Sequence, residues 1–231
     1  LSVKKKDLLY SAFVGFLNPF LYYVILLKAY SLLPAQLAQP LNYLWPVMLI
    51  LLSVPFLGQK LTLKSIVSVT LGFIGVYFIS TRGKLFDYKI EEPIGVLMAA
   101  GSSVIWALFW IMNQKDKRNE QKKLFWAFVF GSFYIMIFLI FFSEFKLPEF
   151  KGILSFFYVG LFEMGITFFL WLKALHLTDR NDRISNLVFL SPFLALIFIH
   201  LILGEPIFYT TITGLILIVS GIFIQQYKQK P

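Results

Sequence analysis

The chain has 231 residues, of which 58% are hydrophobic and 14% are charged, and its net charge is +9. A soluble domain carries about 25% charged residues, so the composition excludes an ordinary soluble fold and favours a protein surrounded by the lipid bilayer. The chain has no cysteine, which excludes disulfides and thiolate metal sites. Its basic stretches lack interleaved aromatic residues, so we expect no nucleic-acid partner.

Long apolar runs predict an all-α membrane protein with eight transmembrane helices. A bilayer core is crossed by about 20 mostly apolar residues in a helix. Such runs occupy residues 8–27, 35–57, 61–80, 93–112, 124–142, 153–175, 184–203 and 209–225. The links between them are short, and the longest, 113–123, is predicted to be a solvated loop.

The distribution of lysine and arginine predicts the orientation. Eight spans place the N-terminus, the C-terminus and the second, fourth and sixth links on one side of the membrane. That side holds fifteen of the 21 basic residues, and the other side holds six. The positive-inside rule therefore predicts a multi-pass protein of the cell membrane with both termini in the cytoplasm. The same rule accounts for the net charge.

Two segments of the chain repeat one another. Residues 14–80 align with residues 159–225 at a shift of 145 that becomes 146, and the matched residues include Gly15 with Gly160, Pro46 with Pro192, Gly58 with Gly204 and Gly75 with Gly221. Five predicted helices separate equivalent positions, and an odd number means that the two units cross the membrane in opposite directions. Secondary transporters built from inverted repeats bind their substrate near the midplane, between the halves.

The two repeats differ in their number of helices. The second has two helices, 93–112 and 124–142, before the three that match the first. Symmetry therefore predicts two further helices upstream of Leu1, so that the chain is a fragment of a longer protein. The alternative is a natural eight-helix protein.

Short motifs in a fixed order resemble the drug/metabolite transporter superfamily, in the branch built from two EamA-type repeats. The residues that carry the resemblance are Phe189-Leu190-Ser191-Pro192, Leu203-Gly204-Glu205, Gly214, Gly221, Trp106-Ala107 and Asn42-Tyr43-Leu44-Trp45-Pro46. The last group resembles the fourth helix of amino-acid exporters in that superfamily, including exporters of aromatic amino acids. The chain departs from the family at Gln59, where a glutamate is common.

The resemblance implies repeats at residues 1–82 and 93–227, within a fold of two inverted five-helix units. It also implies a central cavity lined mainly by helices other than the fifth and the tenth, and a small-molecule substrate. Monomer and homodimer are both left open.

Two polar residues lie midway along predicted helices. Glu163 is about ten residues into its span, where an ionisable group is expensive and usually functional. We expect it to bind a substrate amine or a coupled proton, because burial raises the pKa of a carboxyl. Its repeat partner Asn18 is followed by Pro19 and is a second candidate for the substrate site. The structural alternative for both residues is a hydrogen bond to a neighbouring helix.

Further candidates lie around two prolines within helices. Pro46 and Pro192 each remove a backbone donor and are expected to kink their helices. The remaining predicted substrate-binding residues are Asn42, Tyr43, Trp45 and Trp106, whose aromatic rings suit stacking on a planar solute. The structural alternative is packing against protein or lipid.

Three functions follow from these features. The first is a secondary transporter of small organic metabolites, among them amino acids, which works by alternating access. The second is an intramembrane enzyme, which is disfavoured because no nucleophile, base and metal cluster gathers in the sequence. The third is a non-transporting membrane scaffold or an inactive truncated paralogue. No nucleotide-binding loop is present, so we expect neither ATP hydrolysis nor a cofactor. We expect His176 and His200 to be structural, and Glu205 to stabilise the fold at a helix N-terminus.

Overall fold

A computed structural model describes residues 4–81, 92–142, 148–167, 170 and 191–226 of the chain. Within these ranges every regular element is helical and no strand occurs, which confirms the predicted all-α fold class. The chain divides into two compact units, Leu1–Met136 with Pro192–Pro231, and Ile137–Ser191. Each unit is described by itself.

The described helices overlap all eight predicted spans, and several extend beyond them. They are α1 (Lys5–Gly15), η1 (Phe16–Leu21), α2 (Tyr22–Leu32), α3 (Ala35–Asn42), α4 (Trp45–Leu57), α5 (Leu63–Ser80), α6 (Pro93–Lys115), α7 (Glu120–Phe142), α8 (Phe150–Tyr158), η2 (Val159–Thr167), α11 (Ser191–Phe198), η3 (Ile199–Leu203) and α12 (Tyr209–Gln226). Elements marked η are short π-helices that continue a neighbouring α-helix. Five segments of the described chain are long and apolar enough to cross a membrane, and Ser191–Leu203 and Tyr209–Ile224 are shorter apolar helices.

Local sequence explains where several helices begin and end. Thr62 and Ser65 form a capping box that opens α5, in which each side chain accepts a hydrogen bond from the other residue's backbone N–H. Gly58 ends α4 with a φ of 67°, and Gly204 ends η3 with a φ of 69°. This left-handed conformation suits glycine because it has no Cβ. The two glycines matched by the sequence repeat therefore share one turn geometry.

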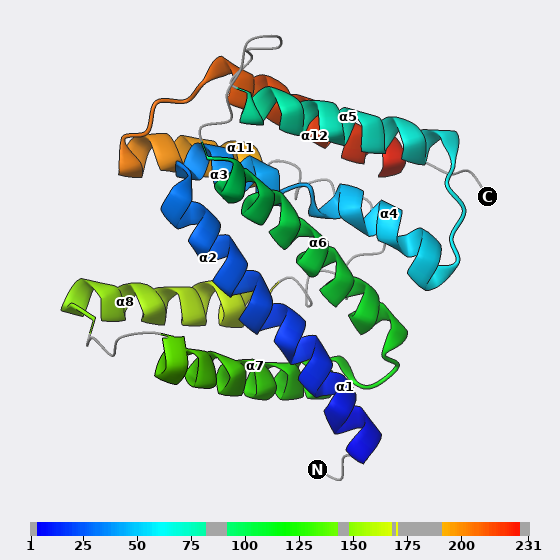
Figure 1. Ribbon diagram of the computed structural model, residues 1–231, viewed down its shortest axis with the longest axis vertical. Coiled ribbons are helices and arrows are strands. Elements are labelled where there is room, and N and C mark those ends of the chain that lie inside the picture. Colours follow the sequence, from blue (N-terminus) through cyan, green and yellow to red (C-terminus); the bar gives the residue numbers. More distant parts are fainter. Residues whose placement is uncertain (1–3, 82–91, 143–147, 168–169, 171–190, 227–231) are drawn as a thin grey trace. The chain divides into compact units, whose positions relative to one another are not determined.

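In the first unit, α6 contacts α2, α3 and α4 along its length (Figure 1). Small residues on α6 allow this close packing, since Ala99 and Ala107 are fully buried and a Cβ on Gly95 would lie 2.8 Å from the side chain of Leu33. Two helix surfaces without large side chains can approach closely in a membrane protein. This arrangement brings α2, α3 and α6 together around one set of polar side chains.

Helices α5 and α12 lie side by side (Figure 1) and approach through small residues. A Cβ on Gly75 would lie 2.5 Å from the carbonyl oxygen of Gly214, and one on Gly221 would lie 2.7 Å from that of Ser68. The repeat shift of 146 converts the first pair into the second, because it carries Gly75 to Gly221 and Ser68 to Gly214. The two helices are therefore antiparallel, and the sequence repeat exchanges one of these two contacts for the other.

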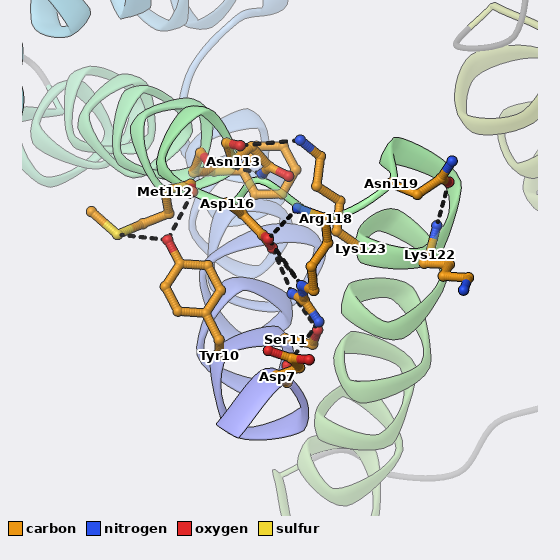
Figure 2. A network of polar contacts seen from close by, with 11 residues as sticks. Asp7, Tyr10, Ser11, Met112, Asn113, Asp116, Arg118, Asn119, Lys122 and Lys123 are labelled. Carbon is orange, nitrogen blue, oxygen red and sulfur yellow. Dashed lines mark hydrogen bonds and ion pairs between the residues drawn. The ribbon is translucent and has the colours of Figure 1, made fainter. Parts of the chain in front are cut away.

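Most described side chains of the polar stretch 113–123 are exposed, as predicted, but the loop is shorter than predicted. Helix α6 continues to Lys115 and α7 begins at Glu120, which leaves a link of only four residues. In this link Arg118 donates hydrogen bonds to the Asp116 carboxylate at 2.6 and 2.9 Å, to the backbone carbonyl of Asp7 at 3.0 Å and to Ser11 Oγ at 2.9 Å (Figure 2). The guanidinium group thereby attaches the link to α1, because its five donors can reach several acceptors at once.

Charge pairing changes the pKa values in this link. Burial acts to raise the pKa of Asp116, but hydrogen bonds from the side chain and backbone of Arg118 outweigh it, and the pKa lies below its ordinary value. The hydrogen bond to Asp116 in turn raises the pKa of Arg118. Nearby, the Lys123 ammonium group is buried and donates to the carbonyl oxygen of Asn113 at 3.1 Å.

The second unit contains α8 and η2, which follow each other without a break. The described side chains from Phe156 to Glu163 are all exposed within the chain. Tyr158 and Phe162 contact each other one turn apart, with ring centroids 4.8 Å apart.

Candidate functional site

The predicted break near Pro46 lies between α3 and α4. Helix α3 ends at Asn42, Tyr43 has a ψ of 1°, and α4 begins at Trp45 with Pro46 in its first turn. Proline is tolerated there because the first helical N–H groups have no intrahelical partner. The break leaves the Asn42 side chain at the end of a short helix inside the span Ala35–Leu57.

Asn42 joins three helices through its side-chain amide. Its Nδ2 donates to Ser102 Oγ of α6 at 2.7 Å, and its Oδ1 accepts from the Tyr22 hydroxyl of α2 at 3.2 Å. Ser102 Oγ then donates to the carbonyl oxygen of Ala99 at 2.6 Å. The Tyr22–Asn42–Ser102 chain is therefore a connected polar path between helices, in a position where unpaired polar groups would be costly.

An aromatic cluster lies against this polar chain. The Tyr22 ring contacts Trp106 of α6, with centroids 4.6 Å apart and the planes inclined by 40°. Trp106 also contacts Phe109 at 6.0 Å and Trp110 at 6.1 Å. Trp106 is half-buried, whereas Ser102 one turn earlier is fully buried. Tyrosine hydroxyl, amide and indole together offer both hydrogen bonds and ring faces to a bound solute.

The structure brings together two of the predicted site residues, Asn42 and Trp106. Tyr43 is buried and Trp45 is half-buried, and both lie at the break beside Asn42. Sequence reasoning missed Tyr22, which links Asn42 to Trp106. The available signal was its position four residues after Asn18 in the same predicted span.

Asn18 lies in a second break, within the span Lys5–Leu32. Its backbone leaves the helical conformation, with φ −149° and ψ 125°, in the π-helix η1 that holds Pro19. The side chain is 2% exposed, and its Oδ1 has no hydrogen-bond partner among the described residues. A buried acceptor without a partner requires an explanation, such as a ligand or water that it binds.

Two glycines allow α7 to contact this break closely. A Cβ on Gly131 would lie 2.5 Å from the Pro19 ring, and a Cβ on Gly15 would collide with the backbone carbonyl of Ala127. The unwound turn around Asn18 is therefore held against α7 without room for a side chain between them.

Glu163 lies in η2 of the second unit, where its side chain is exposed within the chain. Its repeat partner Asn18 belongs to the first unit. Pro192 is the second residue of α11 and is buried, and the residues before Ser191 lie outside the described ranges. The kink at Pro192 stays a prediction, as do the substrate-binding roles of all six candidates, Glu163, Asn18, Asn42, Tyr43, Trp45 and Trp106.

Glu205 differs from its predicted role in one respect. It was expected to favour the helix that follows it, but its carboxylate accepts hydrogen bonds from the backbone N–H groups of Ala35 and Gln36 at the start of α3. His200 Nδ1 lies 2.9 Å from the carbonyl oxygen of Glu205. His176 lies outside the described residues. Within the described part of the chain, no group of three His, Asp or Glu side chains could hold a metal ion.

Long apolar helices joined around buried polar side chains are the features of a multi-pass membrane protein. A model of the EamA-like transporter family matches residues 1–81 and 93–225, and the chain belongs to that family. The family falls in the drug/metabolite transporter superfamily, as the sequence motifs predicted.

Individual relatives agree with this assignment. The chain is 27% identical over 220 residues to the uncharacterized transporter YvbV of Bacillus subtilis (strain 168), which covers 93% of this chain and 70% of the relative. It is 28% identical over 98 residues to the aromatic amino acid exporter YddG of Ancylobacter novellus, covering 42% of this chain and 34% of the exporter. A protein of known crystal structure shares the fold with a TM-score of 0.63 and 21% identity, over 98% of this chain and 76% of that one.

Proposed function

We propose that this chain is a secondary transporter that moves small organic metabolites, amino acids among them, across the cell membrane by alternating access. The observation that carries the proposal is the Tyr22–Asn42–Ser102 chain beside Trp106, which gathers donors, an acceptor and ring faces between apolar helices. Polar groups placed inside a membrane bundle commonly mark a substrate path. The similarity to an aromatic amino acid exporter favours a planar solute with amine and carboxylate groups.

Two broken helices give the site its form. The breaks at Asn18 and at Tyr43 interrupt helices that otherwise span the bilayer. Transporters bind solutes and ions at such interruptions, because unwound backbone and helix ends offer unpaired polar groups. We assign Asn42, Trp106 and Tyr22 to the substrate site, with Asn18, Tyr43 and Trp45 as further lining residues.

The two repeats, 1–82 and 93–227, would supply the moving halves. The self-related contact between α5 and α12 supports this organisation, since an inverted repeat requires such a pairing. The excess of lysine and arginine on one side supports cytoplasmic termini. Proton coupling is assigned to Glu163, the only acidic residue within a predicted span.

The test is uptake into vesicles that contain the purified protein, with a panel of labelled amino acids and with or without a pH gradient. Saturable uptake of one chemical class would establish transport and identify the substrate. A Glu163→Gln protein with unchanged rate and unchanged dependence on the gradient would remove the assignment of Glu163. A folded protein that takes up none of the panel, and that no solute stabilises, would favour the membrane scaffold.

A further inference from the structure

Glu205 connects two helices that are distant in the sequence. Its Oε1 accepts a hydrogen bond from the backbone N–H of Ala35 at 3.0 Å, and its Oε2 accepts one from that of Gln36 at 3.1 Å. These are the first two residues of α3, where N–H groups lack intrahelical partners and the helix dipole favours negative charge. Glu205 itself lies in the link between η3 and α12.

Gln36 makes the reciprocal connection. Its side-chain Oε1 accepts a hydrogen bond from the backbone N–H of Phe208 at 3.1 Å, just before α12 begins. Gln36 is 1% exposed, so this contact is shielded from water. The two side chains thus tie α3 to the start of α12 from both directions. We call the contact of Glu205 and Gln36 with these backbone groups the α3–α12 clasp.

The clasp lies at the opposite end of the span Ala35–Leu57 from a cavity of about 660 Å³. Polar side chains that line the cavity include Gln59, Thr62 and Gln114. Gln59 follows Gly58 as Glu205 follows Gly204, and both glycines are left-handed. The Glu205 carboxylate therefore binds the start of this span, at Ala35 and Gln36. Gln59, the repeat equivalent of Glu205, lies at the other end of the span and lines the cavity.

Buried polar atoms without partners lie near the clasp. The hydroxyl oxygens of Thr210 and Thr211 on α12, and the side-chain carbonyl oxygen of Gln39 on α3, have no hydrogen bond within the described part of the chain. Unsatisfied buried groups are costly, and each would gain water if this end opened. Opening would break the hydrogen bonds of the clasp, but it would also hydrate these unpaired groups. Because the two effects oppose each other, the closed and open conformations can differ little in free energy.

We propose that the α3–α12 clasp is a releasable gate, closed here, that opens and closes one end of the solute path during transport. Glu205 is its positioning residue, because it holds α3, the helix that carries Asn42, against the link to α12. The proposal rests on the transporter function proposed above.

Distance measurements test the gate without any solute. The chain has no native cysteine, so Pro34→Cys and Pro206→Cys, both at exposed positions flanking the clasp, would carry spin labels without background. In the full-length protein in lipid nanodiscs, we expect a short and a long distance, and Glu205→Ala should raise the long-distance fraction at least threefold. The long-distance fraction of the Glu205→Gln protein should lie between those of the native and Glu205→Ala proteins, since the amide oxygen of glutamine still accepts a hydrogen bond. A matched pair, Ser31→Cys with Pro34→Cys, should not change. Identical distributions with and without Glu205 would overturn the proposal.

A reversible bridge tests the same gate with Glu205 intact, so it does not depend on the stability of the Glu205→Ala protein. A bis-methanethiosulfonate reagent would join the cysteines at 34 and 206, and uptake of labelled L-tryptophan would be measured before and after reduction. We expect at least a tenfold loss that reduction restores, whereas normal uptake by the bridged protein would contradict the gate. If the cysteine-free protein takes up no L-tryptophan, transport of this solute fails, and the spin-label distances still decide the gate.

Discussion

The side-chain amide of Asn42 donates to Ser102 Oγ at 2.7 Å while it accepts from the Tyr22 hydroxyl, so one residue at the end of α3 holds α2 and α6. Ser102 is fully buried. A residue in this position serves both the packing of three helices and the polarity of the proposed site. The two roles can be separated by comparing stability with binding.

Replacing Asn42 by alanine should reduce the unfolding free energy by about 1–3 kcal/mol, because Tyr22 and Ser102 each lose a buried partner. Ser102→Ala should cost less than Asn42→Ala, and the double replacement should cost less than the sum of the two, by roughly 0.5 kcal/mol or more. Unfolding in detergent would measure all three. Ser103→Ala is the matched control, since Ser103 is also buried and bonds only the carbonyl of Ala100 among its described partners. Additive costs for Asn42 and Ser102 would contradict a shared bond.

The contribution of Tyr22 to binding should divide between its hydroxyl and its ring. Tyr22→Phe keeps the ring contact with Trp106 and removes one hydrogen bond, so solute affinity should fall by roughly three- to tenfold. Trp106→Leu removes the ring face and should reduce the affinity further. Equilibrium binding of labelled L-tryptophan would measure both. Trp126→Leu is the control, because the ring contacts of Trp126 among the described residues are with Phe125 and Phe130 of α7. Equal losses in all three proteins would place the solute elsewhere.

The helices could be predicted from the sequence because their cause is local. Apolar runs of bilayer length and left-handed glycines act within a few residues, and the repeat located Gly58 and Gly204 in the same turn. A proline also acts on its own helix, which is why a break was expected near Pro46. The break lies at residues 43–44, before the proline.

The partners of the site residues could not be predicted, since they depend on which faces of distant helices meet. Asn42 and Trp106 were recognised by residue type, but Tyr22 was not, because tyrosine is common in membrane helices and its place four residues after Asn18 does not reveal its partners. Gln36 is similar, since its partner Phe208 is far along the chain. The link at 116–119 is shorter than predicted because the flanking polar residues continue α6 and α7. The hydrogen bonds from Arg118 to α1 could not be predicted, since they join distant parts of the chain.

Replacing glycine by alanine should lower stability where the glycine lies in the contact between α5 and α12, and should raise it where the glycine has open space beside it. Gly75→Ala and Gly214→Ala each place a methyl group 2.5 Å from a backbone oxygen, so the helices must separate, and we expect a loss of about 1–3 kcal/mol of stability. Gly101→Ala in α6 meets no atom within 4 Å and should stabilise its helix by up to about 1 kcal/mol. Thermal unfolding of the three proteins measures this difference. A similar loss at Gly101 would show that helix flexibility, rather than close packing, sets the requirement for glycine.

The pair of Arg118 and Asp116 should make stability depend on pH in the acidic range. Since the folded-state pKa of Asp116 is below its ordinary value, the pair stabilises the protein above the unfolded-state pKa of about 3.9. This contribution is lost as the pH falls through the folded-state pKa. Both side chains are largely buried, at 20% and 8% exposed, so Asp116→Asn should cost about 1 kcal/mol at neutral pH.

The difference between the native and Asp116→Asn proteins should therefore shrink below about pH 4, when the native carboxylate also becomes neutral. Unfolding measured across this range tests the sign as well as the size of the effect. Glu149→Gln is the control, because Glu149 is exposed and its side chain makes no capping hydrogen bond to α8. A cost for Asp116→Asn that stays constant down to pH 2 would mean that the shape of the side chain, and not its charge, holds Arg118 against α1.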